Sequence, residues 1–183
     1  MDTAKKDPLL MTAKVLTSIV RIALVLGMIA LGIGIVGVVI ASLGWLPTSI
    51  SDHIAIESDG VVTAANLWLV LLPLLGAGIM VALSYDFVTR LAKMIDTVGE
   101  GDPFTIANAG RLTRMAWLAL AIELVSFVTS ILGDWVERRF DPGEVEFNSE
   151  FSLTGIVLAL VLFILARVFR EGARMRDELE GTV

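Results

Sequence analysis

The chain has 183 residues, of which 56% are hydrophobic and 19% are charged, and a formal net charge of -6; its mean hydropathy is +0.81. Charged residues make up about a quarter of an ordinary soluble domain, so this composition excludes that class and indicates a membrane protein. The negative net charge disfavours direct contact with nucleic acid. The sequence has no cysteine and one histidine, so we predict no metal site and no cofactor.

The first predicted span covers residues 22–43, an uncharged stretch that follows Lys14 and Arg21 and ends before Trp45. About 20 residues of helix cross the hydrocarbon of a bilayer. A secretory signal has an apolar region of only about 7 to 15 residues. We therefore expect this segment to be a retained anchor.

Small residues recur along this span at spacings of three and four, which places them on one helical face: Gly27, Ala30, Gly34 and Gly37. Such a stripe lets a second helix approach closely. Gly32, Gly34 and Gly37 also match a dinucleotide-binding fingerprint, but that motif needs a preceding strand and a helix that opens in water. We interpret the stripe as a helix-packing face.

The next segment, residues 44–60, contains acidic residues and no lysine or arginine, as expected of an outer loop. Asp59 and Gly60 stand between alternating β-branched residues, a pattern that predicts a small β hairpin. The second predicted span covers residues 61–84, with Pro73 near its middle. Proline at such a position usually kinks a membrane helix.

Residues 85–114 are predicted to form a cytoplasmic elbow between two helical hairpins. Apolar residues after Tyr85 recur at helical spacing, so the second span should continue as an amphipathic helix. Pro103 disfavours helix at the residue before it. The side-chain oxygen of Thr105 can then cap a new helix that begins at Ile106.

The third predicted span, residues 115–133, contains Glu123 near its midpoint. A carboxylate at that depth costs about 2.5 to 3.5 kcal/mol on insertion scales, so it should face the bundle interior. Glu123 shares one helical face with Ser126 and Ser130. The set is either a proton-titrating or ligand-contacting site, or a buried acid held by hydrogen bonds, and Arg21 is a candidate partner.

The second predicted outer loop, residues 134–150, alternates in polarity at residues 145–147, where we expect an edge strand that joins the hairpin. The fourth span covers residues 151–169. Charged residues dominate the sequence after it and include Arg174 and Glu178, four residues apart. This spacing predicts an exposed helix supported by ion pairs.

The distribution of basic residues predicts the orientation. Of the 14 lysines and arginines, only Arg138 and Arg139 fall in the predicted outer loops; the others lie in the N-terminal segment, the elbow and the C-terminal segment. This asymmetry is a strong positive-inside signal and predicts that both termini are cytoplasmic. A basic inner surface suits anionic lipid headgroups or an acidic protein partner.

Three features carry a family resemblance: the four-span layout, the elbow sequence GDPFT at residues 101–105 with Asn108, Leu112 and Trp117 after it, and the ending from Phe169 to Val183. Together they resemble a bacterial membrane family known as domain of unknown function 2975. Ala107 departs from its pattern, which has an acidic residue before the asparagine. The resemblance implies a bacterial cytoplasmic-membrane protein with no known enzymatic activity, often encoded beside a small helix-turn-helix regulator of the Cro/repressor type.

We therefore expect one membrane domain over residues 1–183, an all-α, four-helix transmembrane bundle (up-down-up-down) with a small extracytoplasmic β element and cytoplasmic helical extensions. The leading hypothesis is a non-enzymatic regulatory or sensory protein that binds a cytoplasmic helix-turn-helix regulator. The residues expected to form this partner-binding surface are Phe104, Thr105, Asn108, Arg111, Arg170, Arg174 and Asp177. The alternative is a small transporter or ligand-sensing bundle that uses Glu123. A hydrolase is disfavoured because His53 and Glu123 lie at different depths.

Overall fold

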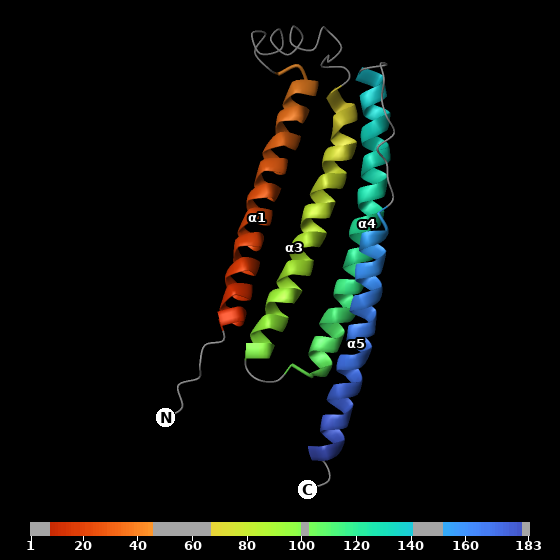
Figure 1. Ribbon diagram of the computed structural model, residues 1–183. Coiled ribbons are helices and arrows are strands. Elements are labelled where there is room, and N and C mark those ends of the chain that lie inside the picture. Colours follow the sequence, from red (N-terminus) through yellow and green to blue (C-terminus); the bar gives the residue numbers. More distant parts are fainter. Residues whose placement is uncertain (1–7, 46–66, 100–102, 141–151, 181–183) are drawn as a thin grey trace. The chain divides into compact units, whose positions relative to one another are not determined.

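The computed structural model describes residues 8–45, 67–99, 103–140 and 152–180, and these residues form long helices (Figure 1). The elements are α1 at Pro8–Ser42, a short 3₁₀ helix η1 at Leu67–Val70, α3 at Leu71–Gly99, α4 at Ile106–Phe140 and α5 at Leu153–Glu180. The model has four helices long and apolar enough to cross a membrane. The predicted all-α class and the four apolar segments are confirmed for this part of the chain.

The start of α4 follows the predicted capping pattern. The backbone N–H of Asn108 donates to the Thr105 hydroxyl oxygen at 3.1 Å, and the N–H of Ala109 donates to the Thr105 carbonyl at 3.1 Å. The first bond satisfies an amide of the first turn that has no partner within the helix, and the second is the first bond of the helix itself. At α5 the hydroxyl of Ser152 accepts from the N–H of Thr154 at 3.2 Å in the same way.

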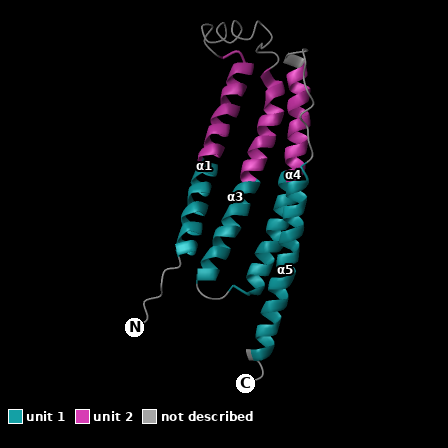
Figure 2. Ribbon diagram, viewed as in Figure 1, with its two compact units in different colours: residues 1–25, 83–122, 152–183 teal, residues 26–82, 123–151 magenta. Residues whose placement is uncertain are grey.

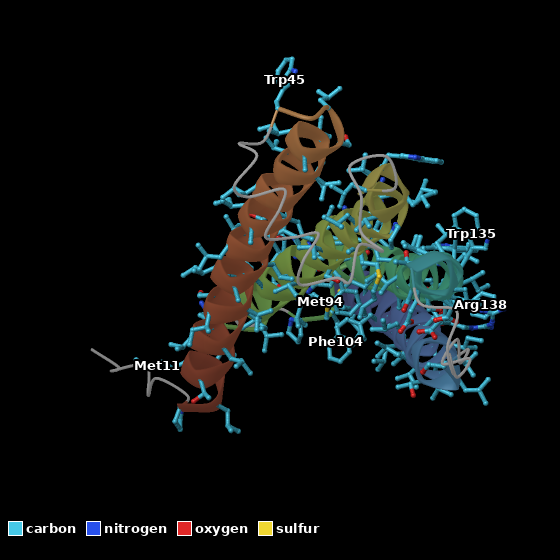
Figure 3. All side chains as sticks on the ribbon, turned by 90° about the horizontal axis from the view of Figure 1, so that it is seen from above. Met11, Trp45, Met94, Phe104, Trp135 and Arg138 are labelled. Carbon is cyan, nitrogen blue, oxygen red and sulfur yellow. The ribbon has the colours of Figure 1, made fainter. Side chains whose placement is uncertain are left out.

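Helix α1 ends at a glycine that takes a left-handed conformation. Gly44 has φ of 72°, its N–H donates to the Ala41 carbonyl at 3.1 Å, and the N–H of Trp45 donates to the Ile40 carbonyl at 3.2 Å. This pair of bonds is the Schellman arrangement that closes helices at glycine. Trp45 then projects from the end of the helix and is exposed (Figure 3).

Two helices are longer than the predicted spans. Helix α1 begins at Pro8, well before residue 22, because proline is tolerated in the first helical turn. Helix α4 continues to Phe140, so the first part of the predicted outer loop 134–150 is helical. The sequence contains no proline between Thr105 and Phe140 that would end α4 earlier.

The predicted β element receives no support from the described residues, which contain no strand. The hairpin expected around Asp59 and Gly60 and the edge strand expected at residues 145–147 both lie outside the described residues. The predicted amphipathic continuation of the second span is present, since α3 extends without interruption to Gly99.

The chain divides into two compact units (Figure 2). Unit 1 comprises residues 1–25, 83–122 and 152–183, and unit 2 comprises residues 26–82 and 123–151. The predicted elbow and the charged end of α5 belong to unit 1, whereas Glu123 and the glycine stripe of α1 belong to unit 2. We describe each unit separately.

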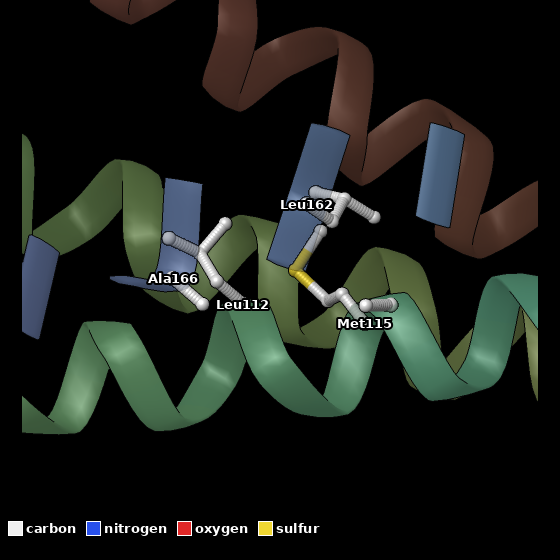
Figure 4. Packing of buried hydrophobic residues seen from close by; sticks show 5 residues of the cluster. Leu112, Met115, Leu162 and Ala166 are labelled. Atoms are coloured by element: carbon white, nitrogen blue, oxygen red, sulfur yellow. The ribbon is translucent and has the colours of Figure 1, made fainter. Parts of the chain in front are cut away.

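The core of unit 1 is a small apolar cluster between α4 and α5. Leu112, Met115 and Ala116 of α4 pack against Leu162 and Ala166 of α5. Figure 4 shows the side chains of Leu112, Met115, Leu162 and Ala166 close together between the two helices. Small residues permit the close approach, because along α5 the buried positions include Ala159, Ala166 and Ala173. In lipid, where apolar burial gives little driving force, such packing is the main source of helix association.

Unit 2 contains one very close helix contact. A Cβ atom added at Gly76 of α3 would overlap the side chain of Thr129 on α4. The predicted packing stripe of α1 is engaged only in part: a Cβ at Gly34 would lie 3.5 Å from Cδ2 of Leu74, whereas Gly27 and Gly37 would meet nothing within 4 Å. Ala30 is exposed.

Candidate functional site

Asn108 is fully buried in the elbow, with an exposed fraction of 0%. Its amide nitrogen donates to the Thr97 hydroxyl at 2.8 Å and to the Pro103 carbonyl at 2.9 Å. The Thr97 hydroxyl in turn donates to the Met94 carbonyl at 2.7 Å. Asn108 therefore joins the end of α3, the connecting segment and the first turn of α4.

Arg111 completes this polar network. Its guanidinium donates to the side-chain oxygen of Asn108 at 2.7 Å and to the Lys93 carbonyl at 3.2 Å. A buried amide with an unpaired group costs about 1 to 3 kcal/mol, so a fully paired network stabilises one arrangement of the elbow. Both residues were predicted to contact a partner. Asn108 is buried, so it supports the predicted partner-binding surface from inside the protein, and Arg111 is half-buried.

Phe104 connects the elbow to α5. Its ring centroid lies 5.0 Å from that of Phe169 with an interplanar angle of 44°. A Cβ at Gly172 would lie 2.9 Å from Cδ1 of Phe104, so the ring rests directly on the backbone of α5. The other side of the ring remains accessible, since Phe104 is 45% exposed. Thr105 is half-buried and serves as the helix cap.

The end of α5 presents the predicted charged residues to solvent: Arg170, Arg174 and Asp177 are all exposed. The predicted ion pair between Arg174 and Glu178 is confirmed at 3.3 Å, and Arg174 also pairs with Glu171 at 3.2 Å.

Two ion pairs strengthen the other helices of unit 1. Lys14 of α1 lies 2.9 Å from Asp96 of α3, and Arg90 pairs with Asp86 at 2.9 Å. Arg21 donates a hydrogen bond to the hydroxyl of Tyr85 at 3.4 Å, and its guanidinium carbon lies 5.7 Å from the centroid of the Tyr85 ring. A tyrosine offers both a hydroxyl group and an aromatic face to the guanidinium group.

The intramembrane polar residues lie on α4 in unit 2. Glu123, Ser126 and Ser130 are all half-buried. The Ser130 hydroxyl donates to the Phe127 carbonyl of its own helix at 2.9 Å. Within the described ranges, no group of three histidine, cysteine or acidic residues could hold a metal ion. The transport alternative based on Glu123 stays a prediction.

Sequence reasoning missed Thr97 and Gly172. Thr97 is the hydroxyl that pairs with Asn108, eleven residues away across the elbow, and Gly172 is the position on which Phe104 rests. Periodicity alone gave no signal for Thr97. Gly172 likewise could not be singled out, because several other helical glycines of the chain, such as Gly78 and Gly110, meet nothing within 4 Å.

Four helices of sufficient length and apolarity, with charged extensions at their ends, define a multi-pass α-helical membrane protein. The family model described as "Protein of unknown function (DUF2975)" matches residues 54–183. The chain belongs to this family. No curated protein and no solved structure matches the chain.

Proposed function

We propose that this is a non-enzymatic regulatory protein of the bacterial cytoplasmic membrane, with both termini in the cytoplasm. Its cytoplasmic surface binds a helix-turn-helix transcription regulator and so controls how much of that regulator is free. The concentration of lysine and arginine in the terminal segments and the elbow supports this orientation. The choice of regulator rests on the family resemblance, and the surface itself rests on the following observations.

The observation that carries the proposal is an exposed apolar stripe on α5. Residues 168, 172, 175 and 179 are spaced by four, three and four, so they share one face of the helix. Phe104 covers Gly172 and fills the gap in this face. We call Phe104, Val168, Met175 and Leu179 the α5 stripe; their exposed fractions are 45%, 53%, 54% and 73%.

The part of the α5 stripe nearest the C-terminus lies beyond the bilayer. The uncharged part of α5 ends at Ala166 and is followed by Arg167 and Arg170, so the helix reaches the lipid headgroups near these two arginines. Met175 and Leu179 then face water, where exposed apolar patches mark interaction sites. Their spacing is the one with which an amphipathic helix packs against a partner helix. A helical protein such as a helix-turn-helix regulator suits this surface.

Charged residues border the α5 stripe. Arg174 is held between Glu171 and Glu178, and Arg170 and Asp177 are exposed. An apolar centre with a polar border is the usual composition of a protein interface. Charged residues at the edge of an interface contribute more to specificity and to the association rate than to affinity. We therefore expect apolar substitutions to weaken binding more than charge substitutions do.

Cross-linking and co-purification of the full-length protein from its native membrane test this function. Wild-type protein should retain a helix-turn-helix regulator, and the double variant M175S/L179S should retain at least tenfold less. The substitution Arg176→Gln lies between the two apolar residues on another face and provides the matched control. The proposal is wrong if the wild-type protein retains no such regulator, or if the double variant retains as much as the control.

A further inference from the structure

An aromatic pair lies on the surface of unit 1 where α4 and α5 pack together. The ring centroids of Trp117 and Phe163 are 5.5 Å apart, with an interplanar angle of 81°. Trp117 is 63% exposed. Phe163 packs against the buried cluster that includes Met115 and Leu162, so buried packing fixes the position of this ring.

Two arginines, Arg114 and Arg167, lie on the elbow side of this aromatic pair. Phe104 of the elbow contacts Phe169, and Trp117 contacts Phe163, so α4 and α5 run in opposite directions. Arg114 precedes Trp117 by three residues on α4, and Arg167 follows Phe163 by four residues on α5. At about 1.5 Å per residue, both arginines are displaced from the pair by about one turn toward the elbow. Residues three or four apart share a helical face.

Arg114 and Arg167 are both exposed. Among the described residues, no hydrogen bond or ion pair joins Arg114 or Arg167 to another side chain, in contrast to Lys14, Arg90 and Arg174. Each is also the charge nearest the apolar segment of its helix on the cytoplasmic side. Residues 115–122 of α4 and 153–166 of α5 are uncharged. The two positive charges therefore lie at the depth of the lipid phosphates.

We propose that Arg114, Arg167, Trp117 and Phe163 form a binding site for an anionic phospholipid of the inner leaflet. The two guanidinium groups donate hydrogen bonds to the headgroup phosphate, which guanidinium matches in geometry and charge. The Trp117 indole lies at the interface, as tryptophan does in membrane proteins, and its ring and that of Phe163 contact the upper acyl chain. This site is independent of the regulator proposed above.

Charge explains why an anionic lipid is favoured over a zwitterionic one. Phosphatidylglycerol presents a phosphate with no compensating cation, whereas phosphatidylethanolamine brings an ammonium group close to two arginines. Each basic residue near an anionic surface contributes about 1 kcal/mol, and 1.4 kcal/mol corresponds to a tenfold change in affinity. Two arginines therefore predict a preference of about tenfold or more for phosphatidylglycerol.

Native mass spectrometry of the full-length protein, with equal amounts of phosphatidylglycerol and phosphatidylethanolamine, tests the site. The wild-type protein should retain phosphatidylglycerol about tenfold better, and R114Q/R167Q should lose most of that preference. The double variant R174Q/R176Q removes the same charge from the end of α5 and is the matched control. The site is refuted if wild type retains both lipids equally, if R114Q/R167Q keeps the preference, or if the control loses it equally.

A second measurement needs no variant and separates a lipid from free phosphate. Phosphatidylglycerol should raise the thermal unfolding midpoint of the wild-type protein in detergent more than phosphatidylethanolamine does, because a ligand that binds the folded state stabilises it. Inorganic phosphate at the same concentration should produce no shift and should not displace the bound lipid. An equal shift with both lipids, or displacement by inorganic phosphate, would overturn the assignment.

Discussion

The amide of Asn108 donates a hydrogen bond to the hydroxyl of Thr97 at 2.8 Å, and this one contact ties the first turn of α4 to the last turns of α3. Asn108 is fully buried and also binds the Pro103 carbonyl and Arg111. The elbow is therefore a fixed structural element that positions Phe104 against α5. Surface residues there depend on a buried polar network for their geometry.

Asn108→Ala should destabilise unit 1. The substitution leaves Thr97 and the Pro103 carbonyl without the donor they now share, and each unsatisfied buried group costs about 1 to 3 kcal/mol. We expect a loss of that size in the free energy of unfolding, measured by titrating a denaturing detergent into the purified protein. Lys14→Ala breaks an exposed ion pair with Asp96 and should cost no more than about 1 kcal/mol.

A double-mutant cycle separates the hydrogen bond from the packing. Thr97→Val keeps the shape of the side chain and removes its hydroxyl. If the two groups act through their mutual bond, N108A/T97V should be less destabilised than the sum of the single changes. Strict additivity would show that the 2.8 Å contact contributes no coupling, contrary to the role assigned to it.

Gly172→Ala should disturb the junction between the elbow and α5. The new methyl group would lie 2.9 Å from Cδ1 and 3.4 Å from Cγ of Phe104, atoms near the base of a ring that is also packed on Phe169. Overpacking of this kind costs about 1 to 3 kcal/mol. Gly110→Ala is the matched control, since a Cβ there meets nothing within 4 Å. It should be neutral or stabilising by up to about 1 kcal/mol.

Thermal unfolding in detergent compares the two glycine variants directly. Phe104→Ala in the same chain should relieve the strain of Gly172→Ala, because it removes the ring that the methyl group meets. It should leave Gly110→Ala unaffected. Equal midpoints for G172A and G110A would contradict the close approach of Phe104 to α5.

Gly76→Ala should be the most damaging small substitution in unit 2. A Cβ at Gly76 would overlap Oγ1 of Thr129 and lie 3.1 Å from its Cβ, so α3 and α4 would have to separate. We expect destabilisation of about 1 to 3 kcal/mol. At Gly78, two residues along, a Cβ meets nothing within 4 Å, and Gly78→Ala should have little effect.

The companion variant G76A/T129A checks the cause of that loss. It removes Oγ1 and Cγ2 of Thr129 and leaves only the Cβ atom near Gly76. Partial recovery in the detergent titration is therefore expected, and complete absence of recovery would mean that the cost of Gly76→Ala arises elsewhere.

The parts of the structure that could be predicted are those governed by local sequence. The start of α4 at Ile106 follows from Pro103 and the capping oxygen of Thr105, and the pair between Arg174 and Glu178 follows from a spacing of four. Both depend only on residues within a few positions of each other.

The contacts that could not be predicted depend on which helix covers which face. Spacing identified Gly27 to Gly37 on α1 as a packing stripe, yet a Cβ atom at Gly27 or Gly37 would meet nothing within 4 Å. Spacing shows that residues share a face and carries no information about the helix opposite. The pairing of Thr97 with Asn108 likewise requires the register between two helices.

Glu123→Gln distinguishes the proposed regulatory function from transport. The substitution keeps the size of this half-buried side chain and removes its ability to change charge, so any activity that needs a titrating carboxylate at this depth should be lost. The α5 stripe lies in unit 1 and Glu123 in unit 2. We therefore expect E123Q to retain the regulator as well as wild type in the co-purification assay, whereas transport that depends on this carboxylate should be lost. Loss of the regulator in E123Q would assign a role in the regulatory function to Glu123. Unchanged retention in E123Q would show that binding of the regulator does not require this carboxylate.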